Sequence, residues 1–186
     1  MSFHYEVRLS GEGGQGLVLA GKILAEAAAI YDGINATQSQ SYGPEARGGA
    51  SRSEVILSDE DIDFPKAQNL DLLLALTQES CDKYARDIKD GGLLLVDDDA
   101  VTRVPEGRYE IWRVPVIRLA RERLNRPIVA NIVALGVITR AAGVVSEEAV
   151  RNAILARVPK GTEQINIEAF EVGLSVAEEL AAKRGA

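Results

Sequence analysis

Residues 5–16 read YEVRLSGEGGQG, and this stretch decides the fold. Apolar and charged side chains alternate from Tyr5 to Leu9, and a period of two predicts a β-strand. Glycines follow at once. Residues 17–31 are then rich in Leu, Ala and Ile, which predicts a helix that is buried nearly all round. A strand, a glycine turn and a helix in this order are typical of the first unit of an α/β fold.

The remaining sequence continues this pattern and then changes to helices alone. Further strands are predicted at residues 34–41, 51–58, 71–76, 93–96 and 109–114, with a crossover helix at 79–88 that Gly91 and Gly92 are expected to close. After Pro115 the spacing of apolar residues predicts helices at 117–124, 128–142, 146–157 and 165–183. We therefore expect one α/β domain over residues 1–186, a Rossmann-like three-layer fold with a mostly parallel sheet and a helical C-terminal layer.

The first predicted strand carries charge on one of its faces, at Glu6 and Arg8. Three explanations stay open from the sequence. That face is incompletely covered, the two charges pair locally, or the strand lies at an edge of the sheet.

The composition excludes several classes of protein. The 186 residues carry 21 Lys and Arg against 28 Asp and Glu, a net charge of −7, which argues against broad binding to nucleic acid. A single cysteine excludes an internal disulfide, a cysteine zinc site and an iron–sulfur cluster held by this chain alone. No apolar run is long enough for a membrane span, and the first residues do not resemble a signal peptide. We therefore expect a cytoplasmic location.

The glycine turn contains the pattern G-x-G-x-x-G at Gly11, Gly13 and Gly16, with Gly14 and Gln15 inside it. Such a turn lets a phosphate approach the backbone and the N-terminus of the following helix. The same glycines also suit a strand that only turns sharply into a packed helix. The pattern alone leaves both interpretations open.

A nicotinamide dinucleotide site needs, in addition, an acidic residue about 20 residues further on, at the end of the second strand. Here that strand ends at residues 38–41, which read QSQS, while Asp32 precedes the strand. Glu12 inside the turn would also repel a pyrophosphate. The sequence therefore disfavours an NAD site.

The loop after the second strand, residues 41–51, reads SYGPEARGGAS. In a parallel sheet this loop lies at the same carboxyl edge as the glycine turn, where open α/β folds bind ligands. The Arg47 guanidinium suits a phosphate or a carboxylate, and Tyr42, Glu45 and Gly48 lie near it in the sequence. An ordinary surface ion pair between Glu45 and Arg47 explains the same residues.

Several separated motifs resemble, in order, those of the gamma subunit of 2-oxoacid:ferredoxin oxidoreductases. They are the glycine turn at 11–16, AG at 20–21, YGPEARGG at 42–49, SEV at 53–55, SD at 58–59, ANIVALG at 130–136 and NIEAFEVG at 166–173. The resemblance covers essentially the whole chain. The sequence at 42–54 is closer to the 2-oxoglutarate branch, since the pyruvate branch carries paired arginines after the acidic residue.

This resemblance implies one subunit of a multi-subunit enzyme. The family converts a 2-oxoacid and coenzyme A to an acyl-CoA, carbon dioxide and reduced ferredoxin. Thiamine diphosphate lies between the alpha and beta subunits, and iron–sulfur clusters lie in the beta and delta subunits. The resemblance implies that the gamma subunit binds none of these alone, packs on the thiamine-binding subunits and helps to shape the coenzyme A channel. The alpha, beta and delta subunits are the expected partners, ferredoxin is an indirect one, and a homodimer of the isolated chain stays open.

On this basis we expect binding residues at the carboxyl edge and no catalytic or metal-binding residue. The glycine turn would present its backbone to a partner loop or to a phosphate of coenzyme A. Tyr42, Glu45 and Arg47 would line the subunit boundary, with Arg47 as the first choice for an anion contact. Asn131 is either a buried polar anchor at the start of a helix or a residue bonded only to neighbouring backbone. The complete set of candidates is Gly11, Gly13, Gly14, Gln15, Gly16, Tyr42, Glu45, Arg47, Gly48 and Asn131.

Four other residues with reactive or aromatic side chains are expected to be structural. Asp82 lies next to Cys81 in the sequence and disfavours a thiolate, so Cys81 is predicted to be an unreactive helix residue. His4 is expected at the surface, and Tyr109 and Trp112 in the core or an interface.

Two alternative functions come from other classes of protein. One is a free-standing, nucleotide-binding oxidoreductase of Rossmann type, and the other is a regulatory module that binds an adenylated ligand. The missing acidic residue after the second strand counts against the first alternative. Neither alternative explains the loop at 42–49 or the later motifs.

Overall fold

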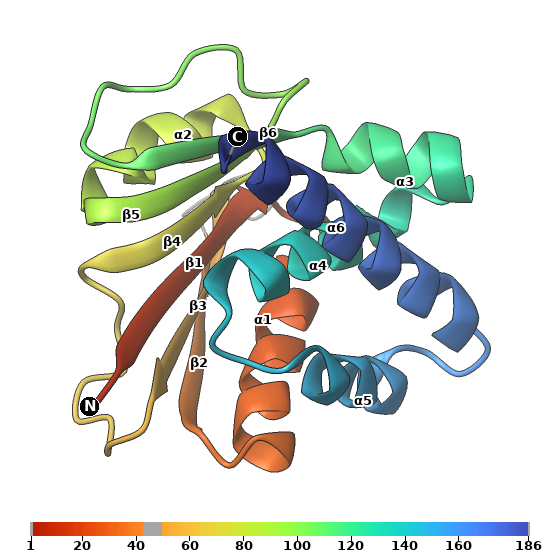
Figure 1. Cartoon of the computed structure of the whole chain (residues 1–186), viewed down its shortest axis with the longest axis horizontal. Helices are drawn as coiled ribbons and strands as arrows, with labels where there is room; N and C mark the ends of the chain where they lie inside the picture. The colour runs from red at the N-terminus through yellow and green to blue at the C-terminus, as the bar shows by residue number, and fades with distance from the viewer. Residues whose placement is uncertain (1, 43–49, 186) are drawn as a thin grey trace.

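The computed structural model describes residues 2–42 and 50–185, and its centre is a six-stranded sheet (Figure 1). The strands are β1 (His4–Glu12), β2 (Asn35–Tyr42), β3 (Ala50–Ser58), β4 (Leu70–Ala75), β5 (Ile88–Asp97) and β6 (Glu110–Val114). The longer helices are α1 (Leu17–Glu26), α2 (Gln78–Tyr84), α3 (Val116–Leu124), α4 (Ala130–Ala142), α5 (Glu147–Arg157) and α6 (Glu163–Arg184). Short helical turns are η1 (Ala27–Tyr31), η2 (Ala85–Asp87) and η3 (Pro127–Val129).

The sheet has the order β2-β3-β1-β4-β5-β6, and the mostly parallel α/β fold is confirmed. β1, β4, β5 and β6 pair in parallel, whereas β3 pairs antiparallel with both β1 and β2. The reversal of β3 follows from its connection to β2. Residues 43–49 are too few for a parallel crossover, which needs about a dozen residues or more. β2 therefore lies at the edge of the sheet, and β3 lies between it and β1.

Helices cover both faces of the sheet (Figure 1). α1, α4, α5 and α6 lie together on one face, where the larger hydrophobic core includes Val7, Leu17 and Ala177. α2 lies on the other face over a smaller core that includes Cys81 and Tyr84. The predicted helical C-terminal layer is thus confirmed. Within the described residues, the model contains no helix with the length and apolar character that a membrane crossing requires.

The two long C-terminal helices touch through their backbones. A Cβ atom on Gly136 of α4 would lie 2.4 Å from the carbonyl oxygen of Phe170 and 2.9 Å from the Cα of Gly173 in α6. A Cβ atom on Gly173 would lie 2.1 Å from the carbonyl oxygen of Val133. Both glycines end motifs that carry the family resemblance, so the last residue of each motif serves a close helix crossing.

The charges on β1 are buried. Arg8 donates to Glu54 of β3 at 3.1 Å, to Asp87 at 2.5 Å and to the carbonyl oxygen of Ala67 at 3.1 Å. Its guanidinium also lies 4.8 Å from the centre of the Tyr84 ring. β1 is an interior strand and both Glu6 and Arg8 are buried, so the explanations of an edge position and of an incompletely covered face are wrong. The two side chains are instead satisfied by groups on neighbouring segments of the fold.

Three sequence-based boundaries are wrong. Gly91 and Gly92 do not close the crossover helix but lie inside β5, where the pairing with β4 is irregular and Gly91 has φ 82°. Tyr42 is the last residue of β2 rather than a loop residue, and Gly11 belongs to β1, opposite Ser51. Each error comes from assigning glycine and its neighbours to turns, although glycine also serves bulges and strand ends.

Candidate functional site

The glycine turn lies at the carboxyl end of β1 and leads directly into α1. The side chain of Gln15 closes the turn, because its Oε1 accepts a hydrogen bond from the backbone N–H of Glu12 at 2.7 Å. Gly14 has φ 87° and Gly16, the residue that caps α1, has φ 75°. These two positions need glycine for their left-handed backbone. Gly13 instead has open space where a Cβ would be.

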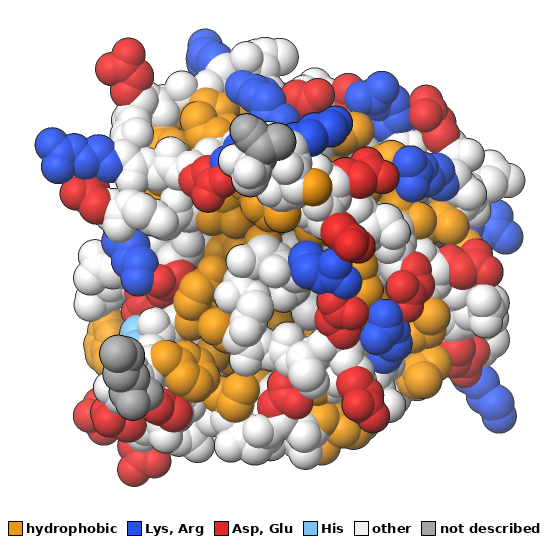
Figure 2. All heavy atoms as spheres, in the orientation of Figure 1, with side chains coloured by type: hydrophobic (Ala, Val, Ile, Leu, Met, Phe, Trp, Pro, Cys, Tyr) orange, Lys and Arg blue, Asp and Glu red, His pale blue; other side chains and the backbone are white. Residues whose placement is uncertain are grey.

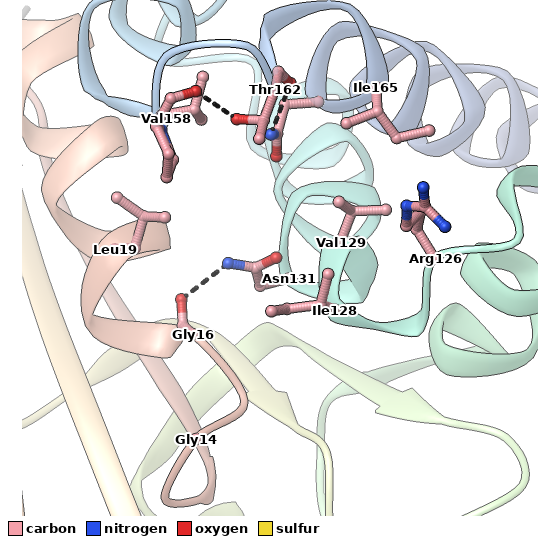
Figure 3. A pocket seen from close by; sticks show the side chains of 12 residues that line it. Gly14, Gly16, Leu19, Arg126, Ile128, Val129, Asn131, Val158, Thr162 and Ile165 are labelled. Atoms are coloured by element: carbon pink, nitrogen blue, oxygen red, sulfur yellow. Dashed lines mark hydrogen bonds between the residues drawn. The ribbon is translucent and has the colours of Figure 1, made fainter.

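Asn131 joins this turn to the start of α4. Its Nδ2 donates to the carbonyl oxygen of Gly16 at 3.0 Å (Figure 3). Its Oδ1 accepts from the N–H of Ile132 at 2.9 Å. The side chain is buried. Asn131 is therefore a buried polar anchor, and one of its two bonds is also local. A Cβ on Gly16 would lie 2.4 Å from Nδ2, so Gly16 leaves room for the amide.

A cavity of about 310 Å³ opens beside this contact, between α1, the start of α4 and the loop from α5 to α6 (Figure 3). Leu19, Val129 and Ile165 point into it from three different elements (Figure 3). The residues that line it are Gly14, Gly16, Leu19, Arg126, Ile128, Val129, Asn131, Val158, Pro159, Thr162, Ile165 and Asn166.

A second hollow of about 310 Å³ shares Gly14 and Ile128 with this cavity. Its lining residues are Gly14, Gln15, Leu76, Ile117, Pro127, Ile128 and Ala130. Ile128 lies in η3 and is 78% exposed, although it is a large apolar residue. The turn is therefore flanked by two hollows that share one exposed apolar side chain.

The polar side chains of the cavity are already bonded to nearby backbone. The Thr162 hydroxyl donates to the carbonyl oxygen of Pro159 at 2.6 Å, and Asn166 Nδ2 donates to the carbonyl oxygen of Thr162 at 2.9 Å. The Asn131 side chain makes the two hydrogen bonds to backbone that are described above. The remaining lining is aliphatic apart from glycine, proline and Arg126.

Positive charge lies next to the cavity. Arg126 is exposed and lines it, and Arg121 and Arg123 lie in the preceding helix α3. Among the described residues, none of these three forms an ion pair, whereas Arg118 of the same helix binds Asp99 at 3.0 Å. Figure 2 shows acidic and basic side chains interspersed over the face that carries α6.

The structure brings part of the predicted site together. The glycine turn and Asn131 meet, and Tyr42 pairs with Ser51 at the same edge of the sheet, where Glu12 pairs with Ala50. The predicted residues Glu45, Arg47 and Gly48 lie outside the described residues.

Sequence reasoning missed Arg126, Ile128 and the loop from α5 to α6. The one available signal was Arg126 and Pro127, a cation and a helix-starting proline just before the 130–136 motif.

The other singled-out residues are structural. Cys81 is fully buried in α2, where burial and then the neighbouring Asp82 raise the pKa of its thiol. His4 is half exposed and lies 3.3 Å from Glu6, and Trp112 is buried in the larger core. These positions agree with the predictions.

The cavity lining contains no carboxylate, histidine, lysine or thiol. Within residues 2–42 and 50–185, no three His, Cys, Asp or Glu side chains are placed to hold a metal ion. The concave, mainly aliphatic lining with one cation suits binding.

Comparisons with known proteins match almost the whole chain. A family model described as pyruvate ferredoxin/flavodoxin oxidoreductase matches residues 6–176. The 2-oxoglutarate synthase subunit KorC of Methanocaldococcus jannaschii is 55% identical over 177 residues, which cover 94% of this chain and 95% of that protein.

Solved structures agree. The keto/oxoacid ferredoxin oxidoreductase gamma subunit from Geobacter sulfurreducens PCA has a TM-score of 0.88 and 54% identity, with 95% of this chain and 98% of that chain covered. The 2-oxoglutarate:ferredoxin oxidoreductase from Magnetococcus marinus, solved with 2-oxoglutarate, coenzyme A and succinyl-CoA bound, has a TM-score of 0.83 at 22% identity. It covers 95% of this chain and 31% of that chain, and it shares the fold.

Proposed function

The chain belongs to the pyruvate ferredoxin/flavodoxin oxidoreductase family as a gamma subunit of a 2-oxoacid:ferredoxin oxidoreductase, and from this premise we propose how it acts in its complex. The complex decarboxylates 2-oxoglutarate oxidatively to an acyl-CoA. This chain contributes subunit contacts and part of the coenzyme A channel, and it supplies no catalytic group. The observation that carries the proposal is the match of almost the whole chain to a 2-oxoglutarate synthase subunit.

The donor groups of this chain support that division of labour. A cubane iron–sulfur cluster needs four thiolates, and this chain has one cysteine. Cys81 is also buried in a helix and its thiol keeps its proton. We infer that the clusters and thiamine diphosphate are held by the alpha, beta and delta subunits, which supply the redox and decarboxylation chemistry.

The carboxyl edge of the sheet is the part of the chain that we assign to the channel. The ends of β1 and β2 meet the start of β3 there. Arg47 lies in the segment that joins β2 to β3, and it is our candidate for a phosphate of coenzyme A.

The experiment is reconstitution of the purified subunits with and without this chain. We expect ferredoxin reduction that depends on both 2-oxoglutarate and coenzyme A only when the chain is present. Full activity without it would contradict the proposal. In the complete complex, Arg47→Ala should raise the apparent KM for coenzyme A. Arg108→Ala is the control and should not raise it, because Arg108 is exposed beside Asp90 near the start of β5, away from the carboxyl edge. An unchanged KM would remove Arg47 from the channel.

A further inference from the structure

The cavity beside the glycine turn offers few polar groups for recognising a nucleotide base. The side chains of Asn131, Thr162 and Asn166 are bonded to backbone of the lining loops, which leaves Arg126 as the one charged side chain of the lining. What the cavity offers is aliphatic surface from Leu19, Val129 and other residues. Burial of an apolar side chain is the interaction that this surface favours.

Ile128 indicates that the surface extends beyond one cavity. It is 78% exposed and lines both hollows. A small ligand in one hollow would leave most of this side chain in water. A protein surface, in contrast, would cover it and fill both hollows, as the central apolar residues of an interface do.

The charges next to this surface favour an acidic partner. Arg126 lines the cavity, Arg121 and Arg123 lie a few residues before it, and none has an acidic partner among the described residues. Residues 121–126 carry three arginines and Glu122, a net charge of +2 in a chain of net charge −7. Interfaces place opposite charges around an apolar centre, which steers association and fixes the register.

We propose that Ile128 and the two hollows beside it form the docking surface for another subunit of the complex, through a segment that carries apolar side chains and at least one carboxylate. The apolar side chains fill the hollows, and the carboxylate binds Arg126. The inference rests on the proposed function and deepens it, because it assigns the glycine turn to a partner segment rather than to a phosphate.

The test uses the complete reconstituted complex. Ile128→Asp puts a charge at the centre of the surface and should reduce the amount of chain that co-elutes with the other subunits by about tenfold or more. Phe64→Asp is the matched control. Phe64 is also a large apolar residue, 53% exposed, but it lies in the connection from β3 to β4, at the opposite edge of the sheet. The amount of the Phe64→Asp chain that co-elutes with the other subunits should equal that of the unaltered chain.

A crosslinking variant identifies the partner. With p-benzoylphenylalanine in place of Ile128, irradiation should crosslink the chain to another subunit, at a segment that contains Asp or Glu. Arg126→Glu should weaken assembly more than Arg126→Lys, and this difference should shrink at high salt.

The outcomes separate the two proposals. If the unaltered chain does not co-elute with the other subunits, the proposed function fails. If it does, but Ile128→Asp also co-elutes fully or the crosslinker reaches no other subunit, only the docking surface is overturned. Intact assembly of Ile128→Asp with a raised KM for coenzyme A would assign the cavity to coenzyme A instead, and would also overturn the proposal.

Discussion

Gly136→Ala tests a close backbone contact in the fold, the crossing of α4 and α6. The added Cβ would lie 2.4 Å from the carbonyl oxygen of Phe170 and 2.9 Å from the Cα of Gly173. Ordinary carbon contacts need about 3.5 Å, so the helices must separate by about 1 Å. These neighbours are backbone atoms and cannot rotate away. Overpacking of this kind costs up to about 3 kcal/mol, and the higher helix propensity of alanine returns about 1 kcal/mol. The net expectation is a loss of about 2 kcal/mol.

The assay is urea and thermal unfolding of the purified chain. For a chain of this size, 2 kcal/mol corresponds to a fall in Tm of about 4–8 °C. Gly13→Ala is the control, because nothing lies within 4 Å of its Cβ position, and it should change stability by less than about 0.5 kcal/mol. Gly136→Ala with Gly173→Ala should cost less than the sum of the single changes, since the first substitution already separates the helices. A Gly136→Ala variant as stable as the original chain would refute the backbone contact.

Three further predictions concern buried polar groups. Asn131→Ala should lower stability by about 1 kcal/mol in urea unfolding, because the Gly16 carbonyl oxygen loses one of its two donors and keeps only the Ala20 N–H, and Asn131→Asp should not restore it. Arg8→Met should cost about 3 kcal/mol, because the buried Glu54 loses its hydrogen-bonded guanidinium and keeps only Arg52 at 3.6 Å, and Arg8→Met combined with Glu54→Leu should recover much of this loss. Alkylation of Cys81 at about pH 8 should be far slower in the folded chain than in urea, since burial raises the pKa of the thiol and blocks access.

Each of these has an outcome that would count against it. For Asn131, equal stability of the alanine variant would show that water replaces the amide. For the Arg8 cluster, a double variant no more stable than Arg8→Met would mean that the cost is not one of an unpaired charge. The protonated Cys81 thiol stabilises the folded chain. This contribution is complete below the pKa of the thiol in the unfolded chain, and it is lost as the pH rises through the higher pKa of the thiol in the folded chain. Equal alkylation rates in folded and unfolded chain would contradict both the burial and this shift.

The first unit of the fold was predictable because its signals are local. The alternation in β1, the glycines at positions 14 and 16 and the apolar residues of α1 specify a strand, a turn and a helix without distant contacts. The cap of α5 was equally local, since Ser146 accepts from the N–H of Ala149 as its position before two glutamates predicts.

The direction of β3 and the pairing of Arg8 were not predictable in the same way. Both depend on which strands become neighbours, and the alternating pattern of a strand is the same in either direction. The two glycines inside β5 show a related ambiguity, because a pair of glycines is compatible both with the end of a helix and with a bulge in a strand.

The candidate site was predictable only in outline. The glycine turn and Asn131 were found from sequence, but their hydrogen bond spans more than a hundred residues and appears only in the folded chain. The cavity is built from α1, η3 and α6, so no single stretch of sequence contains it. Ile128 looks like an ordinary core residue in sequence, and its exposure is a tertiary property.

The most direct test of the central claim is purification of this chain, carrying an affinity tag, from its native source. We predict that it co-purifies with subunits that hold thiamine diphosphate and iron–sulfur clusters, and that the eluate reduces ferredoxin when supplied with 2-oxoglutarate and coenzyme A. A chain that elutes alone, or with proteins that bind neither group, would contradict the account.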